Sequence, residues 1–132
     1  TDGEKKKIDQ YFDGIAKDPY ASVAKLEDRI NNLQSMLTVF TLEKQKTYAE
    51  EVNKYFIPML KKAEKLFPEQ SEVYQSLNNR LKVEIKGVFD KVELFQNLGL
   101  SLEQVPSKIK KQDVQNKEDS TNNPSVVRRN KP

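Results

Sequence analysis

Six apolar residues in the first part of this chain recur at alternating intervals of three and four, which places them along one side of an α-helix. They are Val23, Leu26, Ile30, Leu33, Leu37 and Phe40. Such a helix is stable in water only when its apolar stripe is buried, because helical propensity alone is marginal at this length. The pattern therefore predicts a helical bundle.

Two further stripes follow the same spacing. The second stripe consists of Ala49, Val52, Phe56, Met59, Ala63 and Leu66, and the third of Leu77, Leu81, Ile85, Val88, Val92 and Phe95. A shorter apolar side near the N-terminus is formed by Ile8, Phe12, Ile15 and Ala16. Asp18 followed by Pro19 is typical of a helix start, since Asp is a good N-cap and Pro suits the first helical position. The sequence predicts helices over about residues 4–17, 19–40, 47–67 and 70–98.

The second stripe is out of phase with the first, because continuing the first stripe beyond Phe40 reaches the polar residues Lys44 and Thr47. This phase break predicts a turn within residues 41–47. Residues 47–50 match the capping-box pattern and predict that the next helix starts at Thr47. A single long bent helix is the alternative, since no Gly or Pro interrupts this interval, but we favour the hairpin.

Pro58 falls inside the third predicted helix, where it removes one backbone hydrogen bond and clashes with the carbonyl of Lys54. The stripe continues in phase on both sides, so we expect a kink and not the end of the helix. Gly99 suits the position just after a helix. Residues 101–104 form another capping box and predict a short helix that starts at Ser101.

Short connections between long amphipathic helices favour antiparallel neighbours. The predicted fold class is all-α, an up-and-down bundle of three long helices with the short N-terminal helix packed as a fourth. Residues 1–111 form this helical domain. Residues 112–132 are rich in polar residues and Pro, with few apolar side chains to offset the entropy of ordering, so we expect a disordered C-terminal tail.

The positive net charge of the chain comes from its C-terminal end. Residues 107–132 carry seven basic and three acidic side chains, whereas residues 1–106 carry 16 basic and 17 acidic ones. The predicted bundle is therefore nearly neutral and lacks the strong basic field of a nucleic-acid-binding domain. The chain also contains no His, Cys or Trp, which removes the usual proton shuttle, the thiol nucleophile and the commonest transition-metal ligands.

Three groups of side chains are candidates for function. Tyr48 and Tyr55 flank the second stripe, and the kink at Pro58 can open a groove beside them, which would suit a partner-binding site. The tail carries a small basic cluster of Arg128, Arg129 and Lys131, which suits phosphate or an anionic membrane surface. Asp9 and Asp13 share a helix face, a geometry that can hold a divalent cation, but a solvated acidic face is the simpler interpretation.

The function we expect is that of a non-enzymatic protein–protein interaction module, such as an adaptor, a chaperone-like subunit or a surface-associated subunit. We expect another protein as partner, no cofactor, no metal, and a monomer in preference to a coiled-coil dimer. The alternative is a binder of nucleic acid or of an anionic membrane surface that acts through its basic tail. An enzyme or carrier that uses carboxylates or an apolar cavity ranks last.

The expected location follows from the ends of the sequence. The chain starts at Thr1 and contains neither a signal-peptide core nor a run of about 18 apolar residues that would span a membrane. A processed extracytoplasmic or cell-surface protein, such as the mature part of a lipoprotein, fits these features. An excised domain of a larger chain, with a cytoplasmic location, is the alternative.

Overall fold

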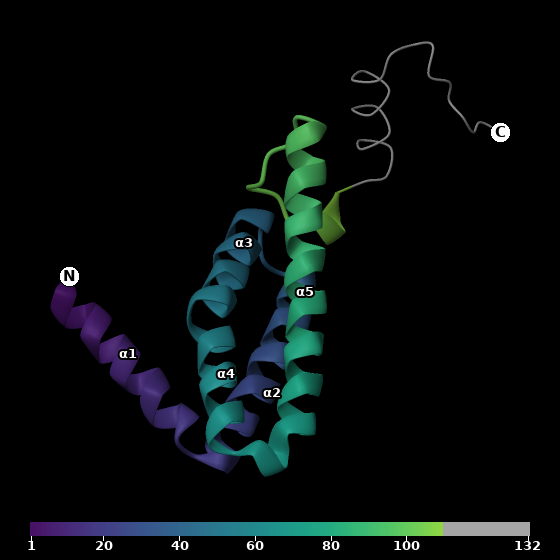
Figure 1. Cartoon of the computed structure of the whole chain (residues 1–132). Coiled ribbons are helices and arrows are strands. Elements are labelled where there is room, and N and C mark those ends of the chain that lie inside the picture. The colour runs from purple at the N-terminus through teal and green to yellow at the C-terminus, as the bar shows by residue number, and fades with distance from the viewer. Residues whose placement is uncertain (110–132) are drawn as a thin grey trace.

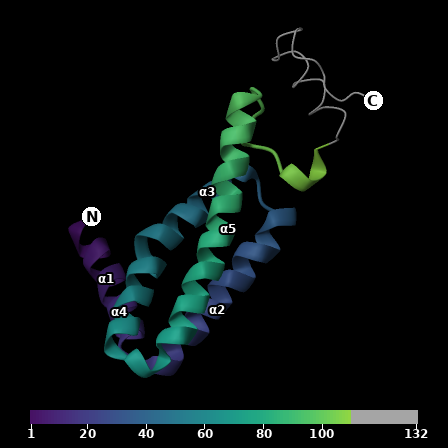
Figure 2. The same cartoon turned by 45° about the vertical axis from the view of Figure 1, so that its right-hand side comes forward.

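The computed structural model describes residues 1–109, which form five α-helices joined by short connections (Figure 1). The helices are α1 (Asp2–Ala16), α2 (Pro19–Ser35), α3 (Leu42–Glu51), α4 (Ile57–Leu66) and α5 (Ser71–Asn97). A π-helical segment, Val52–Phe56, joins α3 to α4 without interruption, so the two form one bent helix (Figure 2). This bent helix packs with α2 and α5. The described residues contain no strand, and the predicted all-α bundle of three long helices plus a shorter N-terminal one is confirmed.

The core is built from the three apolar stripes. All six α5 residues predicted to face inward are buried, as are Leu26, Ile30 and Leu33 of α2. Burying one Leu or Ile side chain contributes about 1.5–3 kcal/mol relative to leaving it in water, so these stripes supply most of the driving force for folding. The stripes are less well buried at their ends, at Val23, Leu37, Phe40 and Leu66.

The corner between α1 and α2 is formed by the predicted Asp-Pro boundary. The Asp18 carboxylate accepts the backbone N–H groups of Tyr20 and Ala21, both at 2.9 Å, and Pro19 is the first residue of α2. These two hydrogen bonds stabilise the ionised carboxylate and lower the pKa of Asp18 below its ordinary value.

The connection between α2 and α3 lies earlier in the chain than the sequence predicts. α2 ends at Ser35, a 3₁₀ turn covers Met36–Thr38, and α3 begins at Leu42 with Thr41 as its N-cap. The predicted hairpin is confirmed. The predicted start of a helix at Thr47 is wrong, because Thr47 lies inside α3 and its hydroxyl bonds to the carbonyl one turn before it.

A buried polar residue, Gln45, explains this shift. Its amide Nε2 donates to the carbonyl of Phe40 at 3.0 Å and lies 3.5 Å from that of Leu37. The carbonyls at the end of a helix lack intrahelical partners, so a side chain that reaches them stabilises the turn. Leu42, Gln45 and Ala49 are all fully buried. The buried face that contains the second stripe therefore begins at Leu42 and includes one polar residue, Gln45.

The π-helical segment accommodates Pro58. Ile57, the residue before the proline, donates its N–H to the carbonyl of Val52, five residues earlier. A π turn of this kind interrupts the regular α-helical hydrogen bonds just where the proline cannot take part in them. The predicted kink is confirmed, and the helix continues through it to Leu66.

Gly99 ends α5, as the sequence predicts. Its φ angle is 71°, in the left-handed region, and the N–H of Leu100 donates to the carbonyl of Phe95 at 2.8 Å. The Gly99 N–H donates to Gln96 at 3.2 Å, which completes a Schellman motif.

The predicted short helix from Ser101 is wrong. Only a 3₁₀ turn, Pro106–Lys108, forms in this segment. The carbonyls of Leu102 and Gln104 instead accept the N–H groups of Glu43 and Leu42, each at 2.8 Å. The segment therefore closes the N-terminal end of α3, where backbone donors have no partners within the helix.

Replacing Gly99 by Ala should lower the free energy of unfolding by about 1 kcal/mol, because a side chain disfavours the left-handed conformation that this position requires. Gly87 is the matched control. It lies in the interior of α5, with nothing within 4 Å of an added Cβ atom. Gly87→Ala should raise the free energy by about 0.5–1 kcal/mol through helix propensity. Urea titration followed by circular dichroism measures both changes. Equal effects of the two variants would contradict the left-handed conformation assigned to Gly99.

The predicted tail of residues 112–132 lies outside the described residues, as do residues 110–111 of the predicted domain. Within residues 1–109, no helix has the length and apolar character needed to cross a membrane.

Candidate functional site

α1 is attached to the bundle mainly through its C-terminal part. Phe12, Ile15 and Ala16 pack against the core, whereas residues 1–11 are all exposed. In both views the N-terminal end of α1 diverges from the bundle (Figures 1 and 2). The side of the molecule that adjoins α1 is formed by side chains from α1, α2, α3 and the π-helical segment.

Six aromatic side chains form a connected series on this side, which we call the aromatic row: Tyr11, Phe12, Tyr55, Phe56, Tyr48 and Phe40. The Phe12 ring stacks parallel to Tyr55 with 5.3 Å between centroids and meets Phe56 edge-to-face at 4.9 Å. Tyr11 meets Phe12 edge-to-face at 5.1 Å, and Phe40 meets Tyr48 at 5.4 Å. Each such pair adds about 0.5–1.5 kcal/mol beyond area burial, so the row also holds α1 on the bundle.

Arg29 of α2 connects the two halves of the aromatic row. Its guanidinium carbon lies 4.3 Å from the ring centroid of Phe56 and 5.1 Å from that of Tyr48. Two of its nitrogens, Nε and Nη1, are buried and have no hydrogen-bond partner. Its side chain makes no ion pair with the carboxylates of residues 1–109.

Three lysines lie over three further rings of the row. Lys25 Nζ is 5.5 Å from the Tyr11 centroid. Lys44 Nζ is 4.1 Å from Phe40, and Lys54 Nζ is 5.3 Å from Tyr55. Positive charge over an aromatic face is attractive, at about 0.5–1 kcal/mol for exposed pairs. The row is therefore accompanied by four positive charges.

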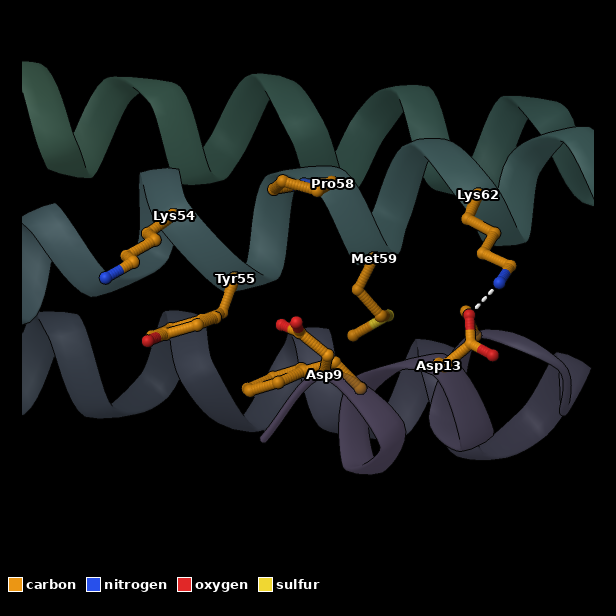
Figure 3. A pocket seen from close by; sticks show the side chains of 9 residues that line it. Asp9, Asp13, Lys54, Tyr55, Pro58, Met59 and Lys62 are labelled. Carbon is orange, nitrogen blue, oxygen red and sulfur yellow. Dashed lines mark ion pairs between the residues drawn. The ribbon is translucent and has the colours of Figure 1, made fainter. Parts of the chain in front are cut away.

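A small open pocket of about 160 Å³ lies beside the row, between α1 and the bend of α3 and α4 (Figure 3). Tyr55 and Met59 project into it from one side, and Asp9 and Asp13 project from α1 on the other. The ammonium group of Lys62 pairs with the Asp13 carboxylate, which Lys17 also approaches at 3.3 Å. The pocket is too shallow and too mixed in character to enclose a cofactor.

The structure brings two of the three predicted site residues on the bundle together, because Tyr55 and Pro58 both line the pocket and Tyr48 does not. Tyr48 and Tyr55 are half-buried members of the aromatic row, and exposed Pro58 lines the pocket. The predicted basic cluster of Arg128, Arg129 and Lys131 lies outside the described residues.

Asp13 is held in ion pairs, so it does not join Asp9 in an open carboxylate pair. The part of the chain that the structure describes contains no group of three or more acidic, His or Cys side chains placed to hold a metal ion.

Sequence reasoning did not find Arg29. The available signal was weak: Lys25 and Arg29 lie one position before the buried residues Leu26 and Ile30, and so border the first stripe. A basic residue next to a stripe is usually solvated, and only the packing of Tyr48 and Phe56 over Arg29 shows that it is enclosed.

Comparison of this chain with protein-family models, with curated proteins and with solved structures gives no match in any of the three.

Proposed function

We propose that this protein is a non-enzymatic helical module that binds another protein, and that the aromatic row is its binding surface. The observation that carries the proposal is the concentration of six of the chain's eleven aromatic side chains on one side of the bundle, around an arginine. Tyr and Arg are enriched at the energetic centres of protein interfaces, because they combine a large apolar area with polar groups.

The exposed members of the row support this proposal, whereas Phe56 is buried in the core. Tyr11 is 52% exposed, and Tyr48 and Tyr55 are each partly exposed. A ring that is already half enclosed and supported by neighbours loses little side-chain entropy when a partner covers it. The row is thus preorganised for contact, which favours binding over a purely structural use of these aromatic residues.

The chemistry of the chain supports a binding role in preference to catalysis. The sequence contains neither His nor Cys, the side chains that most often carry proton transfer and nucleophilic attack near neutral pH. Asp9 and Asp13 are the carboxylates that line the pocket beside the row, and Asp13 is held by lysines.

A site-specific photocrosslinking experiment tests the proposal. A benzophenone amino acid in place of exposed Lys54, beside the row, should crosslink the full-length protein to a protein in extracts of its native source. The same group in place of Val83, which is 68% exposed on α5, is the matched control and should give little of that product. Mass spectrometry identifies the adduct. Equal crosslinking at both positions, or an adduct with nucleic acid only, would contradict the proposal.

A further inference from the structure

Arg29 is an unusual feature of the aromatic row, because two nitrogens of its charged guanidinium are buried without hydrogen-bond partners, although the residue as a whole is partly exposed. Burying a hydrogen-bond donor without an acceptor is costly, and more so when the group is charged. The rings of Phe56 and Tyr48 offset part of this cost through their attraction for the cation. They cannot accept in-plane hydrogen bonds from Nε and Nη1, so these buried N–H groups are left without an acceptor.

The other cations of the row are also without acidic partners. Lys25, Lys44 and Lys54 make no ion pair within residues 1–109, where the side chains that do so are Lys17, Lys62, Arg80 and Lys86. Four uncompensated positive charges therefore lie along one surface of a nearly neutral bundle. Asp9 is exposed and lines the pocket together with Lys54, where its carboxylate reduces this positive field.

We infer that the occupant of the aromatic row is an acidic amphipathic segment of a partner protein, whose apolar side chains cover the rings and whose carboxylate pairs with Arg29. This inference rests on the proposed function and adds the chemistry of the partner. A carboxylate presents two oxygens in the geometry that the guanidinium fork matches. The Tyr48 ring lies over the guanidinium and is only partly buried, so the inferred binding requires this ring to move aside for the carboxylate to reach Nε and Nη1.

The geometry favours an acidic peptide over a nucleic acid. Nucleobases bind to open aromatic faces, but the face of Phe12 is stacked on Tyr55, and both Tyr48 and Phe56 are covered by Arg29. A peptide can reach the exposed parts of Tyr11, Tyr48 and Tyr55 together with exposed Lys44 and Lys54.

The test is a selection of binders by the full-length protein from a displayed library of random peptides of about 16 residues, enough for roughly four helical turns. Recovered peptides should carry net negative charge and regularly spaced apolar residues. Their Kd should rise about tenfold or more in Arg29→Met, the size of effect expected for a charge-assisted contact. Lys44→Glu and Lys54→Glu should also weaken binding. Lys82→Glu, on the exposed face of α5, is the matched charge control and should leave the Kd almost unchanged.

A folding measurement separates a binding role of Arg29 from a structural one. Arg29→Met keeps the aliphatic packing and removes the unpaired donors, so its melting temperature should equal or exceed that of the unmodified protein. A lower melting temperature with unchanged Kd would assign Arg29 to structure and overturn the inference.

Neutral or basic peptides, an empty selection, or oligo-dT binding that depends on Lys44 and Lys54 would overturn the inference too. If such a result accompanies crosslinking to a protein at position 54, the acidic partner is excluded while the proposed binding function stands.

Discussion

Replacing Leu81 by Ala should lower the free energy of unfolding by about 3 kcal/mol. Leu81 is fully buried on α5, the helix that packs against α2, α3 and α4. The substitution removes apolar contacts and leaves a cavity that helices fixed on several sides cannot close. A domain of this size has a total stability of about 5–15 kcal/mol, so a large part of it would be lost.

Val83 provides the matched control, because it lies two residues away on the same helix and is 68% exposed. Val83→Ala removes a similar apolar group and should change the free energy by less than about 0.5 kcal/mol. Both values come from urea unfolding of the full-length protein, followed by circular dichroism. Comparable losses in the two variants would contradict the assignment of Leu81 to the buried face of α5 and of Val83 to its exposed face.

Replacing Gln45 by Ala should lower the free energy of unfolding by about 2–3 kcal/mol. The substitution removes the amide donor of the partly buried Phe40 carbonyl and also creates a cavity in a fully buried position. The expected cost exceeds that of an ordinary hydrogen bond, because the cavity adds to the loss of the amide donor.

Gln45→Leu separates the two contributions. Leu fills the volume of Gln45 and removes the side-chain oxygen Oε1, which is buried without a partner. The loss should therefore be smaller than in Gln45→Ala, at about 1 kcal/mol. Thermal and urea unfolding of the two variants test this order. A larger loss in the Leu variant would mean that hydrogen bonds to the connection between α2 and α3 outweigh packing at this site.

The interior of each long helix could be predicted from the sequence. Apolar spacing identifies Leu77 to Phe95 as one buried face, and all six predicted residues of α5 are buried. Asp18-Pro19 and Gly99 mark helix ends through backbone chemistry that involves only neighbouring residues. These features are local, so periodicity and capping rules are sufficient to find them.

The helix ends near Gln45 and Ser101 could not be predicted in this way. Gln45 donates to the carbonyl of Phe40 from a fully buried position. The Leu102 carbonyl accepts from the N–H of Glu43, which is distant in the sequence. The capping box at residues 101–104 predicts a helix from local rules. In the folded chain, carbonyls of this segment instead accept the backbone N–H groups at the start of α3, which have no partner within that helix.

The candidate site likewise combines features that local sequence patterns predict with a contact that only the packing of helices creates. The sequence by itself determined that Tyr48, Tyr55 and Pro58 lie beside the second stripe of an all-α bundle, because helical periodicity fixes which residues border a buried face. Only the tertiary structure decided that Arg29 from another helix lies between Tyr48 and Phe56, without a hydrogen-bond partner for two of its nitrogens. The physical reason is that a contact between helices depends on their packing angle and rotation, which periodicity along one helix does not specify.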